Sequence, residues 1–336
     1  MLDSSCFSSN FGLVMAHMHL GEADLTDLLT STKKCRSTLF LEKLESKIDW
    51  KPFEALLSRV YSKTRGRQSF PPLILFKSLL LQQWYNLSDY SLEDALSDRI
   101  SFRRFVGISL SESVPDHSVF CRFRDQLRLH DLMEQLNQEL TNQLNHKGLI
   151  LKQGTLVDAS IIQSSARSPD QNKDGSAGRS DVDEDARWVR MGFKRAFGYK
   201  MHVGVDQGSG FIHSHLLTPA NVYEGHVLEP LIHKSEDWVY ADKAYDNKSN
   251  VHLLRDNHIS NGILLHGFSH RKLTETYRAC NRILSQVRCG VERIFGTLKR
   301  SYGYYRVRYR GLKRNSQQLT LLCMAFNMRK MTMIEA

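Results

Sequence analysis

The spacing of apolar residues differs between the first and second halves of the chain. Over residues 38–150 apolar side chains recur at helical intervals, as in the segment 39–48. From residue 154 onward they gather in short alternating or continuous runs, which are typical of strands. We therefore expect an α+β fold, in which a helical block precedes a region of strands and helices.

Start signals divide the helical block into separate helices. Pro71–Pro72 suits the first turn of one helix, because the backbone amides of this turn have no partner within the helix. Ser91 and Asp94 resemble a capping box for the next helix, which is expected to run through LEDALSDRISFRRFVG. Asp116 is expected to cap a third helix, and residues 129–145 predict a long amphipathic one.

Five short strands are expected in the second half. Two of them flank the sequence Gln-Gly-Ser-Gly and predict a β-hairpin. The five expected strands lie at residues 154–162, 199–206, 211–218, 238–245 and 262–266. Residues 165–195 are polar and charged, with interspersed glycine and serine, and predict a long surface loop.

Three parts follow from these patterns. Residues 1–37 show no clear periodicity and are interpreted as a loose arm or as upstream sequence read through, since Met15 and Met18 are alternative starts. Residues 38–150 form the helical domain, and residues 151–336 form the strand-containing domain. A chain of 336 residues is long enough for two such domains.

Charge and composition narrow the class of protein. The formal net charge is +10, which favours a polyanionic partner over a merely basic protein. Residues 288–314 hold nine lysines or arginines and a single acid, Glu292. No apolar run approaches the roughly 18 residues of a membrane span, and no secretory pattern is visible. Six scattered cysteines disfavour a zinc site and indicate free thiols, so we expect a cytoplasmic protein.

Three acidic residues occupy unusual positions. Asp158 interrupts a β-favouring run, Asp242 ends an apolar strand, and Glu292 lies on a helix with basic companions. Two strand carboxylates and one helix carboxylate can hold a pair of hard divalent cations such as Mg²⁺. Such a pair cuts and joins phosphodiesters. For each aspartate taken alone, a cap or a turn is the simpler interpretation.

The helix around Glu292 has a distinct angular pattern of basic and acidic residues. At about 100° per residue, Arg288, Glu292 and Lys299 share one stripe beside the apolar face. A carboxylate flanked by two cations suits a site where metal and phosphate meet. The alternative is a surface helix with a weak Arg288–Glu292 salt bridge. The two strand aspartates favour the functional interpretation.

These motifs resemble those of DDE transposases of bacterial insertion sequences, most closely insertion-sequence family five. The resemblance covers roughly residues 38–330. It is carried by the segments PFEALLSRVY, QQWYNLSDYSLEDAL, SVPDHSVFCRFRDQL, GTLVDASII, FGYKMHVGVDQGSGFIHS, TPANVYE and YADKAYD, and by an R-x3-E-x6-K array. Two positions depart from the family pattern: Ser285 stands where the motif has tyrosine, and Glu224 where relatives often have aspartate.

The resemblance implies a fold, a site and a reaction. It implies an RNase H-like catalytic domain, with a mixed five-stranded sheet flanked by helices, behind an all-helical DNA-binding domain. It maps the catalytic, metal-binding triad onto Asp158, Asp242 and Glu292, and two conserved basic positions onto Arg288 and Lys299. Two Mg²⁺ ions per site, for which Mn²⁺ can substitute, are expected to lie about 3.5–4 Å apart.

The implied partner is double-stranded DNA, both as inverted-repeat ends and as target. The enzyme would cleave phosphodiesters at the ends and join the freed 3′-hydroxyls to target DNA, as a homodimer or a larger synaptic complex. Two alternatives remain open: a metal-dependent nuclease of the same fold without integration, and a transposase-derived DNA-binding regulator.

Further basic residues are candidates for DNA contacts. The segment YGYYRVRYRGLKR interleaves aromatic residues with cations, which suits a track for the DNA backbone or else a merely basic loop. The helices on either side of residue 110 predict a pair like a helix-turn-helix, with an ordinary solvated face as the equal alternative. The candidates are Arg103, Arg104, Arg122, Arg124, Lys200, Arg300, Arg306, Arg308 and Arg310.

Overall fold

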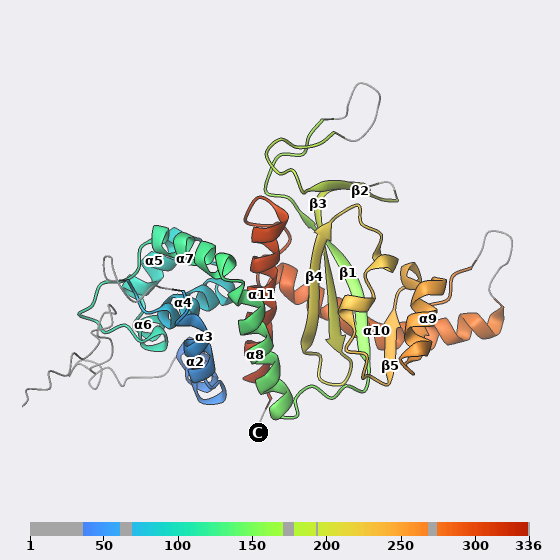
Figure 1. The fold of residues 1–336 in the computed structure, drawn as a ribbon, viewed down its shortest axis with the longest axis horizontal. Coiled ribbons are helices and arrows are strands. Elements are labelled where there is room, and N and C mark those ends of the chain that lie inside the picture. Colours follow the sequence, from blue (N-terminus) through green and yellow to red (C-terminus); the bar gives the residue numbers. More distant parts are fainter. Residues whose placement is uncertain (1–35, 61–68, 171–177, 193, 268–273, 335–336) are drawn as a thin grey trace, which may run out of the picture.

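The computed structural model describes residues 36–60, 69–170, 178–192, 194–267 and 274–334. Figure 1 shows a helical block on one side, a sheet on the other, and the C-terminal helix α11 (Leu312–Met331) between them. This arrangement confirms the predicted α+β fold with a helical N-terminal region. The predicted arm over residues 1–37 lies almost wholly outside the described residues.

The helical block follows most of the start signals in the sequence. Pro71 and Pro72 begin the largely buried helix α4. The carboxylate of Asp116 caps α7 by accepting from the amides of Ser118 at 2.8 Å and Val119 at 3.0 Å. The helices are α2 (Arg36–Lys47), α3 (Lys51–Leu57), α4 (Pro72–Trp84), α5 (Asp89–Asp98), α6 (Ile100–Val106), α7 (His117–Leu129) and α8 (Leu132–His146).

The predicted capping box was placed wrongly. Ser88 caps α5, and its hydroxyl accepts from the amide of Ser91 at 3.0 Å. The single helix expected after Ser91 is two helices, because Arg99 has an extended backbone between α5 and α6. Gly107, with φ of 88°, ends α6 in the left-handed conformation that glycine adopts without strain.

The sheet contains all five predicted strands and one more. Its path runs β4-β3-β1-β5-β6, with β1 antiparallel to β3 and parallel to β5. The additional strand β2 pairs with the first part of β3, so the predicted loop over residues 165–195 is partly a hairpin. The strands are β1 (Thr155–Gln163), β2 (Arg187–Met191), β3 (Lys194–Asp206), β4 (Ile212–Pro219), β5 (Trp238–Ala241) and β6 (Ser260–Ile263).

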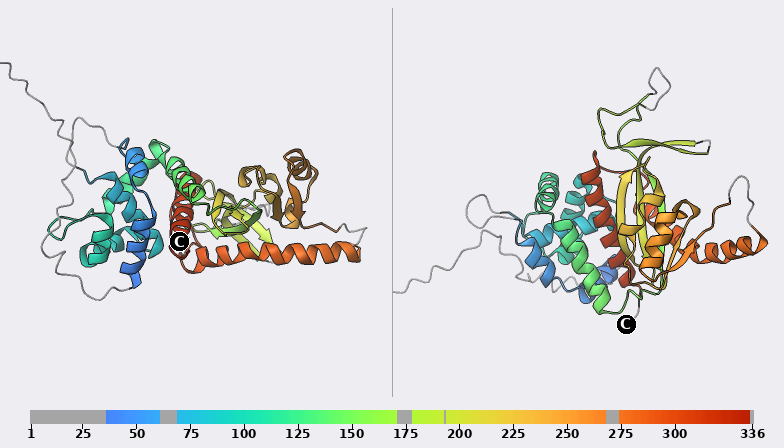
Figure 2. Two further views of the ribbon diagram at one scale, coloured as in Figure 1. Left: turned by 90° about the horizontal axis from the view of Figure 1, so that it is seen from below. Right: turned by 45° about the vertical axis from the view of Figure 1, so that its right-hand side comes forward.

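Helices cover both faces of the sheet. The long helix α10 (Glu275–Arg300) runs across one face and its N-terminal end projects past the sheet (Figure 2). Helix α9 (Lys248–Asp256) packs against β6 above a smaller core that contains Val157. Short 3-10 helices follow β4 and β5: η1 (Glu224–His226), η2 (Glu229–Leu231) and η3 (Lys243–Tyr245).

One continuous apolar core joins the helical block to the sheet through α11. On one side the indole nitrogen of Trp84 donates to the carbonyl of Ala325 at 2.7 Å. On the other side the amide group of Asn327 bonds both backbone groups of Ile212 in β4, at 3.0 and 2.7 Å. Helix α11 therefore fixes the helical block against the sheet that carries the site. Among the described helices, none has the length and apolar character that crossing a membrane requires.

Candidate active site

Strand pairing brings two of the predicted carboxylates together. In the parallel pair of β1 and β5, Val157 lies beside Ala241. Asp158 is the next residue of β1, and Asp242 directly follows β5 with an extended backbone. Neighbouring strands lie about 4.8 Å apart, and side chains at matched positions leave the same face. The register of β1 and β5 thus brings these two carboxylates next to each other.

Helix α10 brings the third carboxylate to this place through Arg288. One terminal nitrogen of Arg288 donates to Oδ2 of Asp158 at 2.7 Å, and the other donates to Oε1 of Glu292 at 3.3 Å. The side chains of Arg288 and Asp158 are 17% and 15% exposed, whereas that of Glu292 is 62% exposed. The guanidinium group therefore lies between a largely buried carboxylate and one at the rim.

A glycine allows this close approach of helix and strand. A Cβ atom added at Gly290 would lie 3.1 Å from Cδ1 of Leu156, a contact tighter than most real Cβ contacts. Gly290 lies between Arg288 and Glu292 on the helix, and Leu156 precedes Asp158 by two residues on the same face of β1. The absence of a side chain at Gly290 lets α10 lie close enough for Arg288 to reach Asp158.

The site carries an excess of negative charge. Burial, the largest cause, raises the pKa of Asp158 to about 6, although Arg288 acts in the opposite direction. Glu224 and Asp242 raise it further, because a like charge nearby disfavours the ionised carboxylate. Arg288, together with Lys200 beside Glu224, therefore does not balance the four acidic groups at this place, and the site is suited to a further cation.

Glu224 is a functional candidate that the sequence reasoning treated only as a departure from a family pattern. It begins η1, and its Oε1 lies 3.1 Å from Nζ of Lys200, which also donates to the carbonyl of Val222 at 2.9 Å. Glu224 is the first of three carboxylates that raise the pKa of the buried Tyr245 hydroxyl, after burial itself. Its position in the motif TPANVYE was the available signal, since this motif directly follows a predicted strand.

The donor set fits a hard divalent cation by type, because carboxylate oxygens are the ligands that such ions take. Within the described residues, however, no group of three or more His, Cys, Asp or Glu side chains is arranged to hold a metal ion. The reason is visible at Arg288, whose guanidinium group lies between Asp158 and Glu292.

Lys299 lies farther along the same stripe of α10, as its spacing predicted. Its Nζ donates to the backbone carbonyl of Ile161 in β1 at 3.0 Å, and burial lowers its pKa. Arg288 and Lys299 thus contact β1 at two points, on either side of Ser160. The array R-x3-E-x6-K therefore lines a length of β1 that begins at Asp158.

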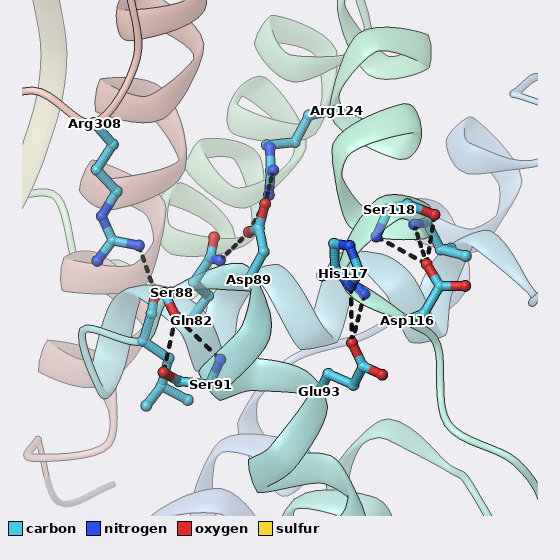
Figure 3. A network of polar contacts seen from close by, with 12 residues as sticks. Gln82, Ser88, Asp89, Ser91, Glu93, Asp116, His117, Ser118, Arg124 and Arg308 are labelled. Atoms are coloured by element: carbon cyan, nitrogen blue, oxygen red, sulfur yellow. Dashed lines mark hydrogen bonds and ion pairs between the residues drawn. The ribbon is translucent and has the colours of Figure 1, made fainter.

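Five of the arginines expected to contact DNA are exposed in the structure, and three others are at least partly buried. The exposed ones are Arg104, Arg122, Arg300, Arg306 and Arg310. Arg124 instead forms two hydrogen bonds with the carboxylate of Asp89, one of them at 3.0 Å (Figure 3).

Arg308 also serves the fold. It donates to the carbonyl of Leu87 and to Oδ1 of Asn86, each at 2.6 Å. Arg103 is buried and donates to the carbonyl of Ser109 at 2.7 Å. Arg103, Arg124 and Arg308 thus have partners inside the protein, and their roles as phosphate contacts stay predictions. Lys200 is buried against Glu224 and Val222, and its contact with phosphate likewise stays a prediction.

Two models of known protein families match the chain. A family model described as Transposase DDE domain matches residues 151–328, which is more than half of the chain. A second, described as Transposase domain (DUF772), matches residues 27–126. No solved structure matches the chain. Neither description names insertion-sequence family five, so that finer placement stays a prediction.

Proposed function

Because the chain belongs to the DDE-domain transposases of insertion sequences, which are enzymes with an RNase H-like fold that cleave and transfer DNA strands, we propose that Asp158, Asp242 and Glu292 are its catalytic carboxylates. The supporting observation is the register of β1 and β5. It sets Asp158 and Asp242 side by side, under the helix that carries Glu292.

The proposed reaction acts on the inverted-repeat ends of an insertion sequence. The enzyme binds these ends, cleaves a phosphodiester at each, and joins the resulting 3′-hydroxyls to target DNA. The helical domain, residues 38–150, is proposed to bind DNA, and residues 151–336 to carry the chemistry. We propose that it acts as a homodimer or a larger synaptic complex, because two ends must be held together for joining.

Transposases with this domain generally use divalent metal ions, and we propose two Mg²⁺ per site, with Mn²⁺ as a substitute. Asp158, Asp242 and Glu292 would hold them, with Glu224 close by. When bound, such ions activate the attacking oxygen and stabilise the leaving one. The protein itself supplies the excess of carboxylates, and burial strengthens their attraction for a cation.

Arg288 and Lys299 are proposed to bind phosphate oxygens next to the carboxylates. Arg288 presents a planar fork of donors that matches phosphate geometry. In the structure this fork contacts Asp158 and Glu292 and thus already lies at the site. A cation bound by the carboxylates would free its donors for the DNA strand.

One assay distinguishes this function from its two alternatives. End-labelled inverted-repeat DNA incubated with Mg²⁺ gives joined products with a transposase, cut products alone with a nuclease, and unchanged bound DNA with a regulator. The variants Asp158→Asn, Asp242→Asn and Glu292→Gln are expected to bind the ends but neither cut nor join them. Asp256→Asn, an exposed residue on α9, is the control and is expected to keep activity. Normal joining by any of the three variants would refute the assignment.

A further inference from the structure

A second candidate binding site, a cavity, lies at the C-terminal end of β1, beyond Asp158. A cavity of about 350 Å³ opens between the β2–β3 hairpin and the segment that links α10 to α11. Three arginines line it, from parts of the chain far apart in sequence: Arg167, Arg195 and Arg306. Trp188 and Phe197 form its apolar wall, with ring centres 5.5 Å apart. The size suits one nucleotide unit rather than a whole duplex.

The cations of this cavity lack acidic partners. Within the described part of the chain, Arg167, Arg195 and Arg306 form no ion pair with a carboxylate. Strand register also sets Arg190 directly opposite Arg195 in the hairpin. Like charges at opposed positions of a β-ladder are unfavourable, so this arrangement is suited to an anion that joins them.

The cavity is held together by backbone contacts at Arg306. The amide of Gln163 donates to the carbonyl of Tyr305 at 3.0 Å, and the carbonyl of Gln163 accepts from the amide of Val307 at 2.9 Å. The linker thus continues the ladder of β1, and Arg306 lies between two fixed neighbours. Its side chain is therefore presented at the end of the strand that carries Asp158.

Asp183 fixes the remaining walls. This residue is buried, and its carboxylate accepts from Oγ of Ser164 at 2.6 Å and from the amide of Gly311 at 3.1 Å, as well as from the hydroxyl of Tyr199. These donors come from the end of β1, the linker and β3. The described residues between β1 and β2 are thereby joined to the sheet and to the segment that links α10 to α11. The cavity therefore exists before any ligand arrives.

We propose that this cavity binds a backbone phosphate of the substrate DNA, at a fixed distance from the bond that is cut. Five residues of β1 separate Gln163 from Asp158, which at about 3.3 Å per residue is roughly 17 Å. DNA rises about 3.4 Å per base pair, so the bound phosphate lies about five base pairs from the scissile one. Trp188 and Phe197 pack against the adjoining sugar. This inference rests on the proposed function, because it takes the DNA at Asp158 as the substrate.

The test measures binding of inverted-repeat duplexes without divalent ions, so that cleavage does not interfere. The long duplex extends ten base pairs past the cut site on both sides. The two sides are shortened to two base pairs in turn, and the short duplex is the one that lacks the side contacted by the cavity. Arg195→Gln and Arg167→Gln are expected to weaken binding of the long duplex about tenfold each. Each is also expected to reduce the slope of log affinity against log salt by about 0.9. Neither change should alter binding of the short duplex. Arg195→Lys, which keeps the charge, is expected to lose less.

The matched control is Arg179→Gln. This exposed arginine also lies between β1 and β2 but does not line the cavity. Its affinity for both duplexes should equal that of the wild type. Three results overturn the proposal: unchanged binding by the two cavity variants, an equal loss in the control, or the same loss on the short duplex. Urea unfolding of each variant checks that the fold is intact. If the wild type itself neither cuts nor joins DNA ends, the proposed function fails. If it does both while Arg195→Gln binds normally, only the cavity proposal fails.

Discussion

Arg288 donates to the carboxylate of Asp158 across the interface between α10 and β1, at 2.7 Å. The pair joins a strand residue to a helix residue 130 positions later, and both side chains are largely buried. The effect on stability of neutralising this carboxylate depends on whether the pair is a structural salt bridge or part of a functional site. In a structural bridge, the loss leaves a buried cation unpaired and lowers stability. In a functional site, the acidic groups repel one another and their removal relieves this repulsion.

Asp158→Asn is therefore expected to raise stability while abolishing cleavage. Burial, together with Glu224 and Asp242, disfavours the charged carboxylate despite Arg288, so a neutral group of the same shape fits better. We expect a gain of about 1 kcal/mol in the free energy of unfolding at pH 7.5, measured with urea. Glu292→Gln is the comparison: its exposed side chain should change stability by less than about 0.5 kcal/mol, also with loss of cleavage. A clear loss of stability in Asp158→Asn would identify the pair as mainly structural.

Lys200→Met is expected to slow cleavage without weakening DNA binding. The ammonium group of Lys200 holds Glu224 and the carbonyl of Val222, and the side chain is buried. Its removal frees Glu224 beside the proposed catalytic carboxylates, and we expect cleavage to fall about tenfold, equivalent to about 1.4 kcal/mol. Affinity for the ends, measured by fluorescence anisotropy, should stay within about twofold.

The control for Lys200 is Lys248→Met, at the exposed start of α9, which should leave both quantities unchanged. The opposite pattern, weaker binding with normal cleavage of bound DNA, would support the prediction that Lys200 contacts phosphate.

The sequence predicts that Asp158 and Asp242 meet in one site, because aspartate within or directly after an apolar strand is unusual. Arg288, which links Asp158 to the helix carboxylate, was also predictable, since Arg288 and Glu292 lie one turn apart on α10. The proximity of Glu224 was not predictable, because it depends on how the segment after β4 folds back against β5. Contacts of this kind arise from tertiary packing, which no local pattern encodes.

The elements whose predicted positions were wrong have physical explanations of their own. Ser88 and Ser91 both suit an N-cap, and the hydroxyl of Ser88 accepts from the amide of Ser91, so the sequence left two solutions. Strand β2 lies within a polar segment and lacks an apolar alternation, since its pairing with β3 does not depend on a buried face. The sequence around Arg124 does not indicate its partner, because Asp89 lies on a different helix.

Arg124→Ala is expected to lower stability without affecting DNA affinity. The guanidinium group pairs with Asp89, which also accepts from Gln82 at 2.6 Å, and it lies 5.2 Å from the ring of Tyr309. Because hydrogen bonds to a charged partner contribute about 1.5–3 kcal/mol, we expect a loss of this size in urea unfolding.

Arg122→Ala, two residues earlier on α7, is the matched control for Arg124. Its side chain is exposed, so stability should change by less than about 0.5 kcal/mol. If the helical domain binds DNA through this face, the affinity of Arg122→Ala for the ends should fall instead. Equal stability of the two variants would contradict the structural role of Arg124.

His202 is expected to make the protein less stable in mild acid. Its side chain is fully buried between β3 and β4, where Nε2 lies 2.9 Å from Oγ1 of Thr218, and burial followed by Lys200 lowers its pKa to about 3. The ordinary pKa of histidine is about 6.5, so between these values the unfolded chain binds a proton that the folded chain does not. Stability is therefore lost as pH falls below about 6.5, by up to about 1.4 kcal/mol per pH unit, and the loss ends near pH 3.

Substitution isolates this contribution. His202→Gln removes the titrating group, so its free energy of unfolding should fall less steeply than that of the wild type between pH 6.5 and 5, even if packing makes it less stable at pH 8. His130→Gln, at an exposed position after α7, is the matched substitution control. Urea unfolding at half-unit pH steps gives the slopes. Equal slopes for His202→Gln and the wild type would mean that His202 is protonated in the folded protein, contrary to its burial.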